Sequence, residues 1–187
     1  MLAQFQMVGR VLFEQQLVSS HSGNLSVRQG EGLVITHRGS RLGSLKQGDL
    51  VETGIARNNR ATPFASSELA VHRCIYKNSS ALAIVHAHPP YAIALSFTED
   101  TIMPCDMEGR FVLPRVLIVG KEIMAKPGEL GEEIAEALRQ DRVVVVKGHG
   151  SFAVGQLLEE AYYYTTVLEQ SCRVLYLLKA LRVNLPE

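Results

Sequence analysis

The sequence predicts a single α/β domain over residues 1–187, with helices packed on a sheet. The first observation is that short β-branched apolar runs, such as residues 143–146, alternate with longer segments whose apolar residues recur at helical spacing. The second is that the chain has no internal repeat, low-complexity tract or long linker that would separate two domains. The third is a length of 187 residues, 47% hydrophobic and 20% charged, which suffices for one sizeable core.

The first part of the chain is predicted to form a helix and three strands. Residues 1–18 carry apolar side chains at roughly helical spacing and are predicted to be helical. Residues 24–28 and 33–36 are predicted to be paired strands, because Gln29-Gly30-Glu31-Gly32 between them is a good hairpin turn. Residues 49–53 form the next predicted strand.

The rest of the chain is predicted to continue as alternating helices and strands. Ser66 or Ser67 is the predicted N-cap of a helix that runs to about Asn78. The remaining predicted elements are a strand over 81–86, a helix over 91–97 opened by Pro89-Pro90, strands over 116–119 and 143–146, and helices over 128–140 and 156–182.

Composition excludes several classes of partner. With 19 basic and 19 acidic side chains, the chain lacks the basic excess typical of nucleic-acid binding, although a local basic pocket for one small phosphate is allowed. The N-terminus does not resemble a signal peptide, and no apolar stretch has the ~18–20 residues of a membrane span. The three cysteines are widely spaced and odd in number. These features predict a cytoplasmic protein with a small-molecule partner.

A pair of histidines lies at the end of a predicted strand. Side chains two apart in a strand point to the same face, so His86 and His88 offer two imidazoles to one metal ion. Pro89-Pro90 restrict the backbone that follows, which suits a preorganised ligand. The alternative is a pair of partly exposed loop histidines.

His149 is a third candidate ligand, at the end of another predicted strand. It lies between Gly148 and Gly150, which permit a sharp turn and close approach of other groups. Three histidines would leave one position of a tetrahedral metal open, as in catalytic sites. Zinc suits this nitrogen-rich set, other divalent metals remain open, and an ordinary loop histidine is the alternative.

Ser66-Ser67-Glu68 is a candidate anion site at a helix start. Its backbone N–H groups, two hydroxyls and the helix dipole could hold an anion, and Glu68 beside a metal could act as a proton-transfer base. The simpler interpretation is a capped helix with an acidic first turn. His72, one turn later, could contact Glu68, although packing is the better expectation.

Two glycine-bearing loops could cradle a phosphate. Ser22-Gly23-Asn24 and Arg38-Gly39-Ser40 both offer backbone N–H groups and hydroxyls, and Arg38 could add a bidentate charged contact. Ordinary turns look the same. Asp106 and Glu108 lie in a polar stretch between apolar runs, for which a surface loop is the default expectation.

Taken together, these motifs resemble the class II aldolase/adducin family and, within it, the L-fuculose-1-phosphate aldolase branch. Each motif is modest alone, but they occur in the family's order and span most of the chain. They are Ser-Gly-Asn-Leu-Ser-Val-Arg (22–28), Ile-Thr-His-Arg-Gly-Ser (35–40), Ala-Ser-Ser-Glu (65–68), His-Ala-His-Pro (86–89) and Gly-His-Gly (148–150).

The resemblance implies a three-layer α/β/α sandwich with a mainly antiparallel central sheet, assembled as a homotetramer with active sites at subunit interfaces. It implies Glu68 as the acid/base, and as an additional zinc ligand when the site is empty. Zinc would be held by His86, His88 and His149, and the substrate phosphate by Gly23, Asn24, Gly39, Ser66 and Ser67.

The implied reaction is reversible cleavage of a ketose 1-phosphate, such as L-fuculose 1-phosphate, to dihydroxyacetone phosphate and an aldehyde. Zinc would act as the Lewis acid that stabilises an enediolate, and Glu68 would remove the carbon-bound proton. The same scaffold supports sugar-phosphate epimerases, dehydratases and decarboxylases. A non-catalytic adducin-like binding domain is a further alternative, which an intact histidine triad beside Glu68 disfavours.

Two departures from the branch affect its substrate contacts. Arg38 stands where the branch often has a small hydroxyl residue and, with Ser40, is expected to change or add a phosphate contact. The region where well-known bacterial members carry a tyrosine instead offers Asp106 and Glu108 as auxiliary groups.

Overall fold

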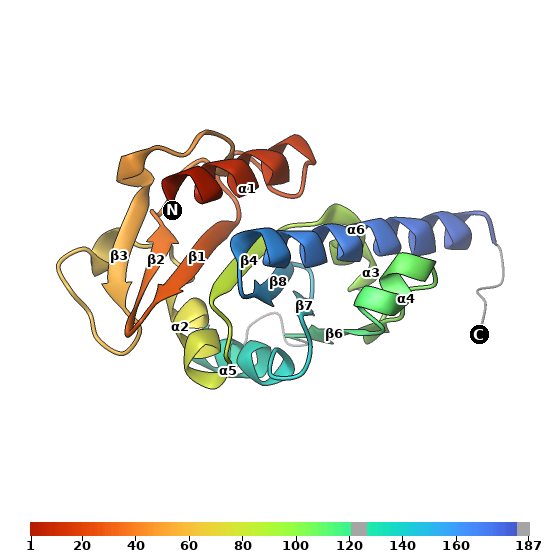
Figure 1. Ribbon diagram of the computed structural model, residues 1–187. Helices are drawn as coiled ribbons and strands as arrows, with labels where there is room; N and C mark the ends of the chain where they lie inside the picture. The colour runs from red at the N-terminus through yellow and green to blue at the C-terminus, as the bar shows by residue number, and fades with distance from the viewer. Residues whose placement is uncertain (121–126, 183–187) are drawn as a thin grey trace.

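A single eight-stranded sheet forms the centre of the computed structural model, which describes residues 1–120 and 127–182 (Figure 1). The strand order is β3-β2-β1-β4-β8-β7-β6-β5, and only β6 and β7 pair in parallel among the described strands. The strands are β1 (Asn24–Gln29), β2 (Gly32–Thr36), β3 (Leu50–Gly54), β4 (Ala83–Ala87), β5 (Thr101–Ile102), β6 (Val116–Val119), β7 (Val143–Val146) and β8 (Gly150–Gly155).

Helices cover both faces of this sheet, which confirms the predicted three-layer arrangement. The face with α1 and α6 also carries α3 and α4, and the opposite face carries α2 and α5 (Figure 1). The α-helices are α1 (Leu2–Glu14), α2 (Leu69–Asn78), α3 (Pro90–Leu95), α4 (Met107–Val112), α5 (Pro127–Ala137) and α6 (Leu158–Ala180); the 3-10 helices are Leu42–Ser44, Gln47–Asp49 and Thr62–Phe64. No described helix has the length and apolar character needed to span a membrane.

Each face of the sheet has its own hydrophobic core, because strand side chains alternate between the two faces. In β4, Val85 packs in the core under α1 and α6, whereas Ile84 packs in the core under α2 and α5. His86 therefore lies on the α2 side, two residues after Ile84. The strand period thus decides which helix layer can reach the candidate metal ligand.

Several predicted boundaries are wrong. The first helix ends at Glu14 rather than residue 18, because Gln16 takes a φ of 59° and turns the chain. The N-cap of α2 is Glu68 and not Ser66 or Ser67; the hydroxyl of Ser66 instead accepts a hydrogen bond from the Glu68 N–H at 3.3 Å.

Besides the 3-10 helices, the elements that were not predicted are β5, α4 and β8. The expected surface loop at Asp106 and Glu108 is wrong, because Asp106 is the N-cap of α4 and accepts a hydrogen bond from Gly109 N–H at 2.8 Å. β8 begins at Gly150 and ends at Gly155. Because glycines are more typical of turns, the sequence did not predict this strand between β4 and β7.

Candidate active site

The three candidate histidines come together at one edge of the sheet. His86 lies in β4, His88 follows it, and His149 occupies the turn between β7 and β8, which pairs with β4. Their candidate ligand nitrogens all lie within 4.8 Å of one another, and the Nε2 atoms of His86 and His88 are 3.0 Å apart. The side chain of His86 is 1% exposed and that of His149 is 44% exposed, so the group lies between the core and open solvent.

Close backbone approaches hold this arrangement. The His88 N–H donates to the Leu17 carbonyl at 2.7 Å, which fixes the chain just after β4. A Cβ on Gly150 would lie 2.4 Å from the Ala87 carbonyl oxygen and 3.0 Å from the His88 ring, so only glycine fits there. Gly150 is therefore needed for β8 to lie this close to His88.

The hydrogen bonds of His86 leave its Nε2 available to a metal. Its Nδ1 lies 2.9 Å from the Ser151 carbonyl, which only accepts, so Nδ1 carries the proton and Nε2 is unprotonated. Burial lowers the pKa of His86 to about 3, and burial also lowers the pKa of His88. Neutral imidazoles with converging nitrogens are the ligands that zinc and related divalent metals require, so this group fits a metal ion.

Glu68 lies directly against the histidines. One carboxylate oxygen, Oε1, is 3.0 Å from His149 Nε2, and the other, Oε2, is 3.1 Å from His86 Nε2. Burial favours a raised pKa for Glu68, but the charge interaction with His86 and the hydrogen bonds from His149 and Asn24 outweigh it and hold the pKa below its usual range. Glu68 is therefore an ionised carboxylate at the edge of the candidate metal centre.

Asn24, an expected phosphate-binding residue, also contacts Glu68 directly. Its amide Nδ2 donates to Glu68 Oε2 at 2.6 Å, and its Oδ1 lies 2.5 Å from Nε2 of His72. The His72 main-chain N–H donates to the Glu68 carbonyl at 3.1 Å, whereas its completely buried side chain reaches the Glu68 carboxylate through Asn24. The spacing of Glu68 and His72, one helical turn apart, was the sequence signal for this connection.

A small cavity of about 170 Å³ lies over Glu68 and the histidines. It brings together the triad, both glycine loops and the Ser66-Ser67 segment, which the sequence had indicated separately. Its lining residues are His21, Ser22, Gly23, Asn24, His37, Arg38, Gly39, Ser40, Ser66, Ser67, Glu68, His86, His88 and His149.

Main-chain hydrogen bonds join the two anion-binding segments. Ser66 N–H donates to the Thr36 carbonyl at 3.0 Å, and Arg38 N–H donates to the Phe64 carbonyl at 2.9 Å. Gly39 has a φ of +73° beside the cavity, a conformation that favours glycine. Ser66, Ser67 and Arg38 therefore line one small space that suits a phosphate group.

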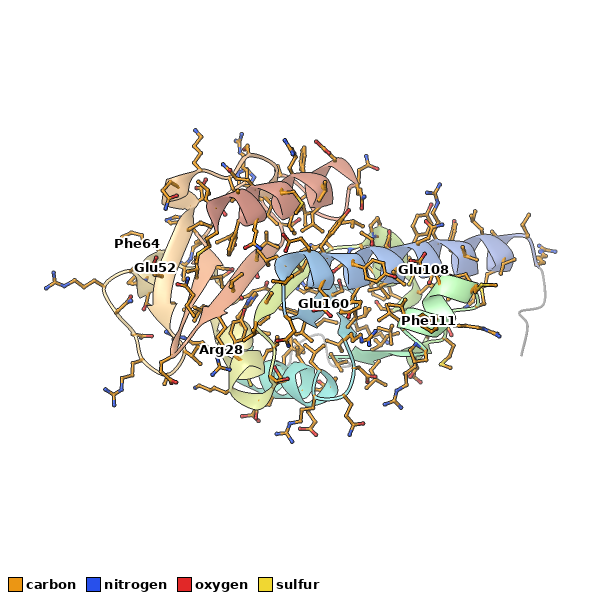
Figure 2. All side chains as sticks on the ribbon, viewed as in Figure 1. Arg28, Glu52, Phe64, Glu108, Phe111 and Glu160 are labelled. Carbon is orange, nitrogen blue, oxygen red and sulfur yellow. The ribbon has the colours of Figure 1, made fainter. Side chains whose placement is uncertain are left out.

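Asp106 and Glu108 are not among the residues that line this cavity. The Asp106 side chain caps α4, and Glu108 accepts a hydrogen bond from the Tyr163 hydroxyl at 3.0 Å. Figure 2 shows Glu108 near α4 and α6, far across the molecule from Phe64, which lies beside β3. Within one chain, neither carboxylate therefore lines the cavity over Glu68.

Comparisons with known proteins agree with this geometry. The sequence profile described as "Class II Aldolase and Adducin N-terminal domain" matches residues 3–176. The L-fuculose phosphate aldolase of Methanococcus maripaludis is 29% identical over 182 residues, which is 97% of this chain and 99% of that protein. The 3-oxo-tetronate 4-phosphate decarboxylase of Pectobacterium atrosepticum is 29% identical over 94% of this chain and 84% of its own length.

A solved structure is similar over the whole chain. The crystal structure of L-fuculose-1-phosphate aldolase from Thermus thermophilus has a TM-score of 0.89 and 37% sequence identity, covering 100% of this chain and 97% of that one. The likeness therefore includes the sheet, both helix layers and the segments that carry the candidate site.

Proposed function

The chain belongs to the class II aldolase and adducin family and is an aldolase-type lyase, and on that premise we propose that it cleaves a ketose 1-phosphate similar to L-fuculose 1-phosphate. The products would be dihydroxyacetone phosphate and an aldehyde. One observation carries the proposal: the ionised Glu68 carboxylate contacts His86 and His149 in a cavity that both phosphate-type loops line.

His86, His88 and His149 would hold the metal ion, for which zinc is the proposed identity because of the all-imidazole ligand set. A divalent metal in this position supplies a Lewis acid for the oxygens next to the bond that breaks. Ser151 fixes the His86 tautomer through its carbonyl, so that the ring presents an unprotonated Nε2.

Glu68 would carry the proton at the reacting carbon. In the condensation direction its carboxylate takes the proton from the carbon beside the ketose carbonyl, and in the cleavage direction it returns that proton to the three-carbon fragment. Gly23, Gly39, Ser66 and Ser67 would hold the phosphate through N–H groups and hydroxyls, with Arg38 adding a positive charge. The phosphate would thus anchor the substrate while Glu68 acts on the reacting carbon.

Decarboxylation of a phosphorylated 3-oxo acid is the second candidate. The similarity to the 3-oxo-tetronate 4-phosphate decarboxylase extends over nearly the whole chain, and Arg38 gives the cavity a cation that could pair with a second anionic group. The same scaffold also supports epimerase and dehydratase reactions, but no comparable observation favours either of them for this chain. The triad with an adjacent ionised acid disfavours a non-catalytic, adducin-like binding domain.

A substrate panel with and without chelator separates these candidates. Purified protein is incubated with ketose 1-phosphates, ketose 5-phosphates and a 3-oxo acid phosphate, and dihydroxyacetone phosphate, aldehyde and carbon dioxide are measured. Release of dihydroxyacetone phosphate that chelator abolishes supports the proposal. Carbon dioxide release alone would replace it with decarboxylation, and protein that neither contains nor binds a divalent metal would overturn both.

We further propose a cytoplasmic homotetramer with active sites at subunit interfaces. Assembly is supported by Met107 and Phe111 of α4, whose apolar side chains are 89% and 88% exposed in the single chain. A reducing, cytoplasmic setting is supported by the free thiols of Cys74, Cys105 and Cys172. Light scattering of the purified protein tests the assembly, and a stable monomer would contradict it.

A further inference from the structure

A row of buried polar side chains leads from the protein interior to Glu68. Glu68, His72 and Tyr76 are four residues apart along α2, so they lie on one side of the helix. Asn24 and Ser26 are two residues apart in β1, so they share one face of the sheet. The helical and strand periods together place five polar side chains in one line.

Each neighbour in this row is within hydrogen-bonding distance. The Tyr76 hydroxyl is 2.7 Å from Ser26 Oγ, and Ser26 Oγ is 2.6 Å from His72 Nδ1. His72 Nε2 is 2.5 Å from Asn24 Oδ1, and Asn24 Nδ2 is 2.6 Å from Glu68 Oε2. Ser26 and His72 are 0% exposed and Tyr76 is 1% exposed, so water does not compete for these bonds.

The chemistry of the groups fixes the direction of every bond. Asn24 donates from Nδ2 to Glu68 Oε2, so its carbonyl oxygen Oδ1 faces His72. His72 must then donate from Nε2. Burial lowers the pKa of His72 to about 4, so at neutral pH the ring has a single N–H and Nδ1 is an acceptor for the Ser26 hydroxyl.

We propose that His72 is a positioning residue that sets the orientation of the Asn24 amide, and through it the position of the Glu68 carboxylate. Without an N–H donor at His72 Nε2, the Asn24 amide is free to rotate, which would place its oxygen against the carboxylate of Glu68. Two acceptors would then face each other, and Glu68 would lose the hydrogen bond that holds Oε2. The inference rests on the proposed role of Glu68 as the proton carrier.

Two other roles do not fit the row. Ser26, His72 and Asn24 have the residue types of a nucleophilic triad, but Ser26 is fully buried beneath Tyr76 and its hydroxyl donates to the ring. A proton relay from His72 to Glu68 is also excluded, because an amide nitrogen that donates to Glu68 cannot pass on a proton accepted at its oxygen without changing tautomer. The row therefore orients and does not react.

The tautomer of His72 is the first test, and it needs neither substrate nor metal. Nitrogen-15 NMR of protein labelled in its histidines is recorded at pH 7, and the His72 signals are assigned by their loss in His72→Gln. A neutral ring with its proton on Nε2 is expected. A proton on Nδ1, or on both nitrogens, would overturn the proposal whatever the protein's substrate.

A matched pair of variants forms the second test. In His72→Gln the side-chain amide can replace Nε2 as the donor to Asn24, whereas in His72→Asn the shorter amide replaces Nδ1 and leaves Asn24 without its donor. Using the ketose phosphate that the substrate panel identifies, His72→Asn is expected to lower kcat about 10- to 100-fold with KM changed less than 3-fold. His72→Gln is expected to stay within 3-fold of the unmodified kcat, with metal content equal in both.

A purely structural role for His72 would give other results. Ile75→Val, a neighbouring buried change on α2, provides a variant of lowered melting temperature that leaves the row intact. If kcat follows melting temperature across all three variants, or if His72→Gln is as slow as His72→Asn, the proposal is overturned. The double variant Asn24→Ala/His72→Asn should be no slower than Asn24→Ala alone, because His72 acts only through Asn24. A further loss of kcat in the double variant would overturn the proposal. If no substrate on the panel reacts, the proposed function fails while the NMR result still decides the orientation.

Discussion

Asn24 and His86 are direct partners across the β1–β4 ladder, and both side chains lie against the Glu68 carboxylate. The carboxylate oxygen Oε2 of Glu68 is 2.6 Å from Asn24 Nδ2 and 3.1 Å from His86 Nε2. The antiparallel register of β1 and β4 thus places the Asn24 amide donor and the imidazole of His86, a candidate metal ligand, next to the same Glu68 oxygen. Glu68 is held by the sheet even though it belongs to the start of a helix.

Replacing Glu68 with Gln should keep the metal and stop proton exchange at the ketose carbon. The amide preserves the size of the side chain but cannot take a proton, and loss of such a base typically costs 10²–10⁴-fold in rate, so exchange should fall by about that factor. Exchange in deuterated water is followed by NMR alongside metal analysis. Normal exchange with normal metal content would remove Glu68 from its proposed role.

Replacing His149 with Ala should weaken metal binding by more than about 100-fold. Loss of a group that only supports a ligand costs roughly 10- to 100-fold, and His149 is one of three converging imidazoles. Affinity is measured by competition with a chromogenic chelator. His21→Ala is the matched control, because His21 lines the same cavity outside the triad; equal affinities in both variants would exclude His149 as a ligand.

Replacing Gly150 with Ala should both destabilise the protein and reduce its metal content. The added methyl group would lie 2.4 Å from the Ala87 carbonyl oxygen and press on the His88 ring, and such overpacking typically costs about 1–3 kcal/mol. Chemical denaturation and metal analysis measure the two effects. Gly48→Ala, where a Cβ meets nothing within 4 Å, should change neither; a Gly150 variant with unaltered metal content would contradict the close-approach argument.

Replacing Arg38 with Ala should raise KM with little change in kcat. A charged hydrogen bond is worth about 1.5–3 kcal/mol, which corresponds to a roughly 10- to 100-fold weaker contact with an anionic group. Inhibition by inorganic phosphate should weaken in parallel. Arg10→Ala is the control, because Arg10 is exposed and does not line the cavity. Unchanged KM in the Arg38 variant would show that this side chain does not contact the substrate.

Replacing Glu169 with Gln should remove a pH-dependent part of the stability. Tyr91 and Ala92 N–H groups at the start of α3 donate to the Glu169 carboxylate at 3.0–3.1 Å, yet burial raises its pKa to about 7. The folded protein therefore holds a proton that the unfolded chain has already lost. The stabilisation from this proton is complete below the unfolded pKa of about 4.5 and is lost as pH rises through 7.

The measurement for Glu169 is urea denaturation of both proteins from pH 5 to pH 8. Relative to Glu169→Gln, the unmodified protein should lose about 2–3 kcal/mol of unfolding free energy over this range. Any fixed cost of placing an amide near the α3 N–H groups is the same at each pH. A difference between the two proteins that does not change with pH would refute the raised pKa.

Local sequence patterns were enough for the fold class and for most elements. Alternating β-branched runs predicted β4, β6 and β7, and the turn at Gln29-Gly30-Glu31-Gly32 predicted the β1–β2 hairpin. The predicted boundaries were wrong where the backbone conformation, rather than the spacing of apolar residues, ended an element, as it does at Gln16 after α1. β8 was missed because its pairing with β4 and β7 comes from contacts far apart in sequence, which its glycine-flanked composition does not show.

The sequence by itself determined the candidate chemistry: paired histidines at strand spacing, a third histidine between glycines, and an acid beside two hydroxyls. Those features depend only on the local periods of strand and helix and on the turn preferences of glycine. Only the tertiary structure decided that β8 brings His149 to His86, that β1 sets Asn24 opposite His86, and that His72 reaches Glu68 through Asn24. The physical reason is that sheet register and helix docking are fixed by burial of the whole core, and no short stretch of sequence contains that information.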